Sequence, residues 1–238
     1  MNKIEGSRCD LDQDMKIQFI AMMLAVSVLG AGCAKNELET LPTPSISPSM
    51  AQTAPSVAAS TSSTVSVSTH ATNTITLPLS DALSRVTKKS FGLYVTPQHS
   101  PVSPERFKGY HVGTDFETTA DEKDAVVSVQ AICDGALAMK KRATGYGGVA
   151  VQRCKINGGE VTVIYGHLKL TSVTASVGHV FRAGDALGVL GKGFSTETDG
   201  ERKHLHLGIH RGKAISILGY VQSKAALSAW IDPMSVLR

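Results

Sequence analysis

From residue 91 onward, apolar residues come in short runs that alternate with polar residues and are separated by Gly, Asn and Asp. Runs of this length and period are typical of β-strands. We expect strands over residues 124–132, 136–140, 148–156, 160–165, 180–190 with a turn at 183–185, and 205–210. Few segments have a helical period, so the pattern predicts a mostly β fold: an antiparallel β-sheet domain with short helices.

Two turns and two helices complete the predicted elements. Asn157-Gly158 lies between two strand-like runs and indicates a tight hairpin, because both central residues of the favoured turn need positive φ. A second hairpin is expected to turn within residues 142–147. Short helices are expected over residues 79–89 and 223–230, where start and stop signals flank the pattern.

The N-terminal residues have the pattern of an export signal. Lys16 precedes a mostly apolar run over residues 17–29 that is short for a membrane span and is followed by small residues and Cys33. Residues 1–14 carry more acids than bases, the wrong sign for the region before such a signal, which favours a translation start at Met15. The alternative is a short buried helix of a cytosolic protein.

After Cys33 the composition changes abruptly. Residues 34–80 are rich in Ser, Thr, Pro and Ala and contain almost no large apolar residues. Such a segment cannot bury enough apolar surface to offset the entropy of ordering it, so we expect a disordered linker. The chain is therefore expected to divide into a leader over 1–33, this linker over 34–80, and a folded domain over 81–238.

The charge of the chain excludes one class of partner. It has 24 Lys and Arg residues against 20 Asp and Glu residues, a formal net charge of +4. There is no basic run of the kind that binds nucleic acid, so we expect no nucleic-acid partner.

Two of the four cysteines are expected to pair. Cys9 would be lost with the leader and Cys33 precedes the linker, which leaves Cys133 and Cys154 in the domain. An even remainder in an exported protein suggests a disulfide. A hairpin centred near residue 144 would place these two almost opposite each other, about 5 Å apart at Cα, which a disulfide can bridge. The alternative is two separate buried thiols.

The chemistry of the chain is concentrated in five residues. His111 and Asp115 are spaced i, i+4, His167 follows a predicted strand, and His204 and His206 form a His-x-His pair. In an extended strand the two members of that pair lie on the same face, roughly 7 Å apart. Catalytic zinc takes three His, Asp or Glu ligands and keeps a position for water, so five residues could hold one zinc ion and leave two bases beside it. Each histidine alone would more simply be a packed or solvated residue, as we expect for His70, His99, His179 and His210.

The order of these motifs resembles the lysostaphin-type (LytM-like) zinc metallopeptidases of bacterial cell walls. The resemblance covers about residues 94–238 and rests on four motifs. These are His-x-Gly-x-Asp at 111–115, Tyr-Gly-His-Leu at 165–168, His-Leu-His at 204–206 and Trp-Ile-Asp-Pro at 230–233. It implies that His111, Asp115 and His206 bind one Zn²⁺ ion, while His167 and His204 serve catalysis.

The implied chemistry is peptide hydrolysis. Zinc held by two imidazoles and one carboxylate would polarise the scissile carbonyl and lower the pKa of bound water to about 7. A nearby histidine could accept that proton, donate one to the leaving amine or stabilise the oxyanion, and the sequence leaves open which histidine does which. Tyr110 and Tyr165 could line the groove or pack in the core.

Two departures from the family pattern affect what can be carried over. Gly208 stands where many relatives carry a glutamate two residues after the second histidine of the pair, which could alter the support beneath the metal. The segment 192–203 is longer and more charged than the compact turn usual there, and it would border the groove. Because the segment 192–203 borders the groove, the substrate preference of the family cannot be carried over to this chain.

The resemblance implies a zinc endopeptidase that hydrolyses the peptide cross-links of peptidoglycan. Cys33 resembles the acylated cysteine of bacterial lipoproteins, so we expect an exported lipoprotein held to a membrane by lipid on Cys33; ordinary signal-peptide cleavage is the alternative. Ala34 resembles the sorting context of the outer rather than the inner membrane. The alternative functions are a wall-binding or hydrolase-activating lipoprotein without catalysis, and a zinc-scavenging lipoprotein.

Overall fold

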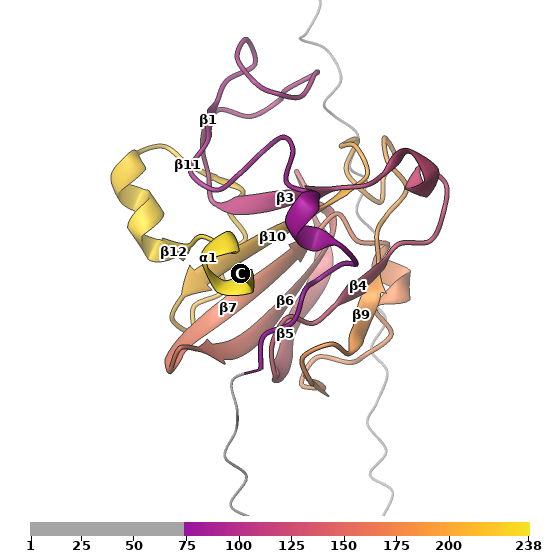
Figure 1. Cartoon of the computed structure of the whole chain (residues 1–238), viewed down its shortest axis with the longest axis vertical. Coiled ribbons are helices and arrows are strands. Elements are labelled where there is room, and N and C mark those ends of the chain that lie inside the picture. The colour runs from indigo at the N-terminus through magenta and orange to yellow at the C-terminus, as the bar shows by residue number, and fades with distance from the viewer. Residues whose placement is uncertain (1–73) are drawn as a thin grey trace, which may run out of the picture. The chain divides into compact units, whose positions relative to one another are not determined.

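The computed structural model of the chain describes residues 74–238, the coloured part of the ribbon in Figure 1. The predicted export signal, Cys33 and residues 34–73 of the predicted linker lie outside the described residues. The strands are β1 (Tyr94–Val95), β2 (Gly109–His111), β3 (Gly113–Glu117), β4 (Ser128–Gln130), β5 (Gly135–Ala143), β6 (Gly147–Ile156), β7 (Gly159–Gly166), β8 (Val180–Phe181), β9 (Ala186–Val189), β10 (His204–Arg211), β11 (Tyr220–Val221) and β12 (Trp230–Ile231). The helices are α1 (Met234–Leu237) and the 3-10 helices η1 (Ala82–Ser84), η2 (Ala120–Glu122), η3 (Leu170–Ser172) and η4 (Lys224–Ala229).

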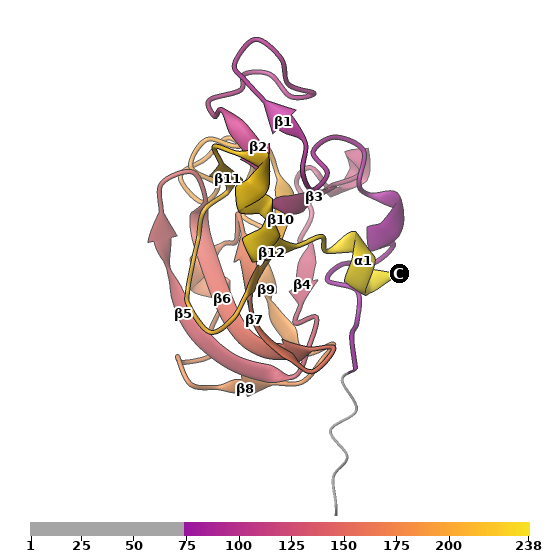
Figure 2. The ribbon, with the colours of Figure 1, turned by 90° about the vertical axis from the view of Figure 1, so that its left-hand side faces the viewer.

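Most of the strands form one antiparallel sheet, as the sequence pattern predicts. Its order is β12-β10-β7-β6-β5-β8, and the long strands β5, β6 and β7 lie side by side in both views (Figures 1 and 2). One edge of β10 pairs with β7, and the other is shared by β3 and β12. Two small sheets, β1-β2-β11 and β4-β9, complete the described domain. The mostly antiparallel β fold class is therefore confirmed.

The predicted hairpins are present with small shifts. Asn157 and Gly158 have φ values of 51° and 77°, and they connect β6 and β7 as a two-residue turn. The other hairpin connects β5 to β6 through residues 144–146. The run expected over 124–132 forms only the short strand β4, and the run over 180–190 is divided into β8 and β9 as its central turn predicts.

The two predicted helices are shorter than expected. Within 79–89 only η1 is helical, because the carbonyls of Arg85 and Lys89 accept hydrogen bonds from the backbone of Glu117 and Asp115. This segment lies beside β3 instead of continuing as a helix. At the C-terminal end η4 gives way to β12 at Trp230, whose pairing with β10 ends the helix. No helix within residues 74–238 is long and apolar enough to cross a membrane.

Apolar side chains are buried on both faces of the main sheet. Leu205, Leu207 and Ile209 of β10 belong to the larger core cluster. Val149 and Val151 of β6 belong to a second cluster. Alternate residues of a strand point to opposite faces, so β10 places its three remaining buried positions, at 204, 206 and 208, on the face opposite to its leucines. This is the face that carries the candidate chemistry.

Cys133 and Cys154 form a disulfide at the end of the β5–β6 hairpin. Gly135, and not Cys133, lies opposite Cys154, because the hairpin is centred at residue 145, where Ala143 pairs with Gly147. The two cysteines are 6.2 Å apart at Cα, slightly more than a direct pair would give. The expected pairing is present, with a diagonal geometry.

Candidate metal centre

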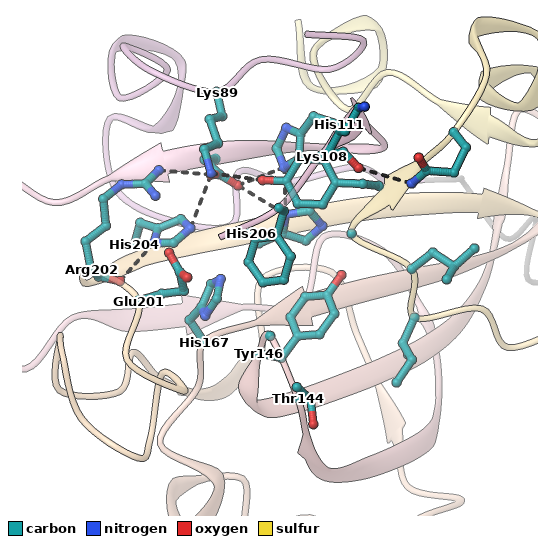
Figure 3. Close-up of a pocket in the computed structure, with 18 residues that line it drawn as sticks. Lys89, Lys108, His111, Thr144, Tyr146, His167, Glu201, Arg202, His204 and His206 are labelled. Carbon is teal, nitrogen blue, oxygen red and sulfur yellow. Dashed lines mark hydrogen bonds and ion pairs between the residues drawn. The ribbon is translucent and has the colours of Figure 1, made fainter. Parts of the chain in front are cut away.

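Four polar side chains come from two neighbouring strands. In the antiparallel pairing of β3 with β10, His206 lies opposite Asp115 and His204 lies opposite Glu117. Directly opposed residues point to the same face of a sheet, and so do residues two apart on one strand. The four side chains therefore gather on one face, where Figure 3 shows His204 and His206 beside each other on their strand.

His111, the last residue of β2, completes a cluster of three buried donors. His111 Nε2 lies 3.0 Å from His206 Nδ1 and 3.3 Å from Asp115 Oδ1. His206 Nδ1 lies 3.1 Å from the same Asp115 oxygen. Two imidazole nitrogens and one carboxylate oxygen thus converge on one point: each residue offers one ligand atom, and these three atoms lie within 4.8 Å of one another.

The donor chemistry fits a cation at this point. His111 Nδ1 is 3.2 Å from the carbonyl of Ser90, so it carries the proton and donates it to that oxygen. His111 Nε2 then presents a lone pair toward Asp115 Oδ1, which is itself an acceptor. Two acceptors 3.3 Å apart need a proton or a cation between them. Two neutral imidazoles and a carboxylate form the kind of set that zinc accepts in catalytic sites.

The ionisation of the cluster suits metal binding near neutral pH. Burial is the main cause that lowers the pKa of His206 to about 4, although the hydrogen bond to Asp115 acts in the opposite direction. Burial by itself would raise the pKa of Asp115, but the neighbouring His204 and His111 side chains hold it well below its ordinary value. The cluster therefore offers a neutral imidazole and an ionised carboxylate, the forms that bind metal.

His204 and His167, the predicted catalytic pair, lie beside this cluster. His204 Nδ1 donates to the carbonyl of Arg202 at 2.9 Å, so its Nε2 faces Asp115 Oδ2, 3.2 Å away. The ring of His167 is 4.3 Å from that of His204, centroid to centroid. Burial, followed by the charge of His204, lowers the pKa of His167 well below its ordinary value. His167 also has a φ of 64°, a conformation that a side chain other than Gly rarely adopts and that is common at functional sites.

Glycines make the space for His206. A Cβ built on Gly113, the central residue of the His-x-Gly-x-Asp motif, would lie 2.7 Å from the His206 ring and 2.5 Å from a backbone carbonyl. On the other neighbouring strand a Cβ on Gly166 would lie 2.5 Å from the ring of Tyr146. Gly208 leaves room beneath the site, and His206 Nε2 is buried there without a hydrogen-bond partner among the described residues.

The donors open into a cleft of about 320 Å³. Its lining includes Tyr146 and Tyr220. The two tyrosines considered from the sequence pack elsewhere: Tyr165 is buried and donates to Gln152, and Tyr110 packs at a tilt against Tyr94. His99, His179 and His210 are not in this lining either, as expected for packed or solvated residues.

Several residues of the cleft were not found from the sequence. Arg202 is the penultimate residue of the charged segment 192–203, and its guanidinium contacts Asp115. Lys89 is buried with Glu105 at 2.6 Å and donates to Tyr220. A buried Lys or Arg is unusual unless it is paired, but the sequence gives no sign of which acid will pair with it. The two partners of Lys89, Glu105 and Tyr220, are 16 and 131 residues away from it along the chain.

Comparison with known protein families shows what the described domain is similar to. Residues 109–217 match peptidase family M23, and this range contains all five candidate site residues. The described domain is accordingly similar to peptidase family M23. We refer to it as the M23 domain. Among curated proteins, no sequence matches the chain significantly.

Solved structures match parts of the chain at low identity. The catalytic domain of lysostaphin from Staphylococcus simulans is 20% identical, over 67% of this chain and 97% of that one, with a TM-score of 0.45. LytU is 25% identical, over 63% and 81% of the two chains, with a TM-score of 0.42. Csd3 from Helicobacter pylori is 18% identical, over 69% and 34%, with a TM-score of 0.43. The similarity of the M23 domain to this family rests on the sequence match.

Proposed function

We propose that the M23 domain is a zinc-dependent endopeptidase that hydrolyses the peptide cross-links of bacterial peptidoglycan. The observation that carries the proposal is the convergence of His111 Nε2, Asp115 Oδ1 and His206 Nδ1, with two further histidines beside them in an open cleft. Similarity to peptidase family M23 supports a metallopeptidase type of enzyme.

In this proposal His111, Asp115 and His206 hold one Zn²⁺ ion. When bound, zinc acts as a Lewis acid toward the scissile carbonyl and makes water a better nucleophile near neutral pH. The remaining steps belong to side chains of the chain itself.

His204 moves the proton. Because its Nδ1–H is held by the carbonyl of Arg202, its Nε2 is the basic atom and faces the site. That atom can accept a proton from the attacking water and later give it to the departing amine. His167, kept neutral by burial, has one N–H left to donate to the oxyanion as it forms.

Tyr146 offers a second donor to the oxyanion. Its hydroxyl lines the cleft, is buried, and has no hydrogen-bond partner among the described residues. Burial and the charge of Asp115 raise its pKa, so it stays protonated. Its ring packs edge-on against His206 and at a tilt against His167, which fixes its position.

Isolated sacculi provide the direct test. The purified full chain is incubated with sacculi, with and without a zinc chelator, and the released fragments are analysed by mass spectrometry. New amino termini at the cross-links that disappear with the chelator and return with added zinc are the expected result. Unchanged muropeptides from zinc-loaded protein would refute the proposal.

His204→Ala separates the enzyme from a hydrolase activator or wall-binding protein. The variant keeps the three proposed ligands, so zinc content should be unchanged while hydrolysis is lost. An activator would retain its effect on partner hydrolases in the same variant, and a wall-binding protein would retain its affinity for sacculi.

We further propose that the protein is exported and anchored by lipid on Cys33, at the outer membrane, so that the M23 domain faces the wall. The support is the apolar run over 17–29 that ends near Cys33, followed by a Ser/Thr/Pro-rich segment. Cys33→Ala should shift the protein from the membrane to the soluble fraction of fractionated cells.

A further inference from the structure

We propose that Arg202 is a positioning residue for Asp115, and that it makes this carboxylate a one-oxygen ligand by holding its second oxygen away from the metal. The inference rests on the proposed function in one respect, that a divalent metal occupies the cluster of His111, Asp115 and His206. It assigns a role to a residue of the charged segment 192–203, which the family resemblance left without one.

The two oxygens of Asp115 have different partners. Oδ1 faces the other two candidate ligands, His111 Nε2 at 3.3 Å and His206 Nδ1 at 3.1 Å. Oδ2 accepts from Arg202 Nη2 at 2.9 Å and lies 3.2 Å from His204 Nε2. One oxygen thus points at the metal position, and the other is occupied by a cationic donor.

The guanidinium is itself fixed from the other side. Arg202 Nε donates to Glu117 Oε2 at 2.9 Å, and Nη2 also contacts Glu117 Oε1. Glu117 is two residues after Asp115 on β3, so the two carboxylates share a face and the planar guanidinium bridges them. The Arg202 side chain is only 11% exposed, and the Lys88 ammonium is 3.7 Å from the Glu117 carboxylate. This row of alternating charges leaves little freedom for Asp115 to rotate.

The consequence concerns the open coordination position. A catalytic zinc site has three protein ligands and one exchangeable position. If Asp115 bound through both oxygens, its second oxygen would compete for that position. By engaging Oδ2, Arg202 keeps the protein ligands at three donor atoms.

Residue 202 has a second contact that does not depend on its side chain. Its backbone carbonyl accepts the proton of His204 Nδ1. A substitution of Arg202 therefore removes the hold on Asp115 and leaves this hydrogen bond available, so the two effects can be measured separately.

Arg106 provides a matched control. It is an arginine outside the lining of the cleft, and it also bridges two acids, Glu201 at 2.8 Å and Asp199 at 3.5 Å. None of its hydrogen-bond partners within residues 74–238 is a candidate metal ligand. Arg106→Met thus removes a comparable ion pair without touching Asp115.

The experiment uses the full chain loaded with Co²⁺, whose visible absorption is strong for four-coordinate and weak for five- or six-coordinate sites. Wild-type protein and Arg106→Met should both show the strong four-coordinate spectrum. Arg202→Met should show a several-fold weaker band, because Oδ2 joins the metal, and hydrolysis of sacculi by its zinc form should fall about 10-fold to 100-fold. Arg202→Lys, which keeps the charge but cannot bridge both carboxylates, should give an intermediate spectrum.

Three results would overturn the inference. One is a cobalt spectrum of Arg202→Met identical to that of wild type, whether or not activity falls, since Arg202 would then act on something other than Asp115. Another is an equal change in Arg106→Met. The third is a wild-type protein that takes up no cobalt, which would also refute the proposed zinc site.

If wild type binds cobalt but does not cleave sacculi, only the proposed function fails and the spectra still decide the role of Arg202. Should Arg202→Met not fold, the comparison of Arg202→Lys with wild type decides.

Discussion

At the residue scale, the candidate site depends on where side chains are missing as much as on where they are present. His206 lies between strands that carry Gly113 on one side and Gly166 on the other. Both glycines are at distances from their neighbours that exclude a Cβ, at 2.5 Å in each case. The glycine of the His-x-Gly-x-Asp motif is therefore a packing requirement of the site, and the motif contains three functional positions instead of two.

Gly113→Ala tests this requirement. The added methyl group would clash with both the His206 ring and a carbonyl of β10, so zinc affinity should fall at least 10-fold and the free energy of unfolding by about 1 to 3 kcal/mol. Competition with a chelator measures the first and urea unfolding the second. Gly159→Ala is the control, because the nearest atom to its added Cβ is at 3.5 Å and the change should alter neither quantity appreciably. Unchanged zinc affinity in Gly113→Ala would contradict the packing argument.

Tyr146→Phe tests the hydroxyl in the cleft. The proposed role as a donor to the oxyanion predicts a fall in kcat of about 100-fold or more, since removal of such a donor typically has that effect. The hydroxyl has no partner within the described domain, so its removal leaves no unsatisfied group. Zinc content and the urea midpoint should therefore equal those of wild type. An active Tyr146→Phe enzyme would exclude the hydroxyl from the reaction.

At the element scale, the pairing of β3 with β10 assembles the site. Asp115 and Glu117 alternate with the buried Phe116, and His204 and His206 alternate with buried leucines. A shift of one residue by either strand would turn its two polar side chains into the core, so burial of the apolar residues fixes the positions of the polar ones.

The disulfide acts on a different element, the β5–β6 hairpin. It closes a segment with a sequence separation of 21, and such a cross-link typically stabilises a fold by about 3 kcal/mol. The double variant Cys133→Ala, Cys154→Ala should lose about this much free energy of unfolding. Val149 of β6 and His206 of β10 both pair with Gly166 of β7, so they lie in one row across the sheet. Cys154 is five residues along β6 from Val149, which places it about 17 Å from that row. Zinc affinity should therefore not change.

Urea unfolding with and without reductant measures this effect. Reductant should lower the midpoint of the wild type and leave that of the double variant unchanged. A wild-type midpoint that does not respond to reductant would show that the disulfide adds no stability. A loss of zinc affinity in the double variant would show that the hairpin and the site are coupled.

At the scale of the whole molecule, the sequence predicts what depends on local pattern. The Asn157-Gly158 turn, the long strands and the antiparallel fold class follow from alternation and turn residues. The helix expected over 79–89 is reduced to η1, because the backbone there bonds to β3, a contact across about 30 residues that local pattern does not contain. Arg202 was not identified as part of the site for the same reason. Its role depends on the register of β3 against β10, and the sequence shows only a charged segment.

Residues 79–89 also make the stability of the described domain depend on pH. Arg85 donates to both oxygens of the Glu122 carboxylate, and also to the carbonyls of Ser80 and Glu117. The hydrogen bond from Arg85 is the main cause that lowers the pKa of Glu122 from 4.5 to about 2, and burial acts in the opposite direction. Because the pKa is lower in the folded state, the unfolded state binds more protons between these values. The stabilisation from this pair is then complete above pH 4.5 and is lost as the pH falls toward 2.

Glu122→Gln isolates this contribution. Glu122 is partly exposed to solvent, so we expect the wild type to exceed the variant by about 1 kcal/mol or less in free energy of unfolding at pH 7. The difference should shrink steadily below pH 4.5 and vanish near pH 2, as measured by urea unfolding at several pH values. Glu160→Gln, whose carboxylate pairs loosely with Lys155 at 3.7 Å on an exposed hairpin, is the control and should show no such convergence. A difference between wild type and Glu122→Gln that stays constant from pH 7 to pH 2 would mean that the Arg85 pair does not couple proton binding at Glu122 to folding.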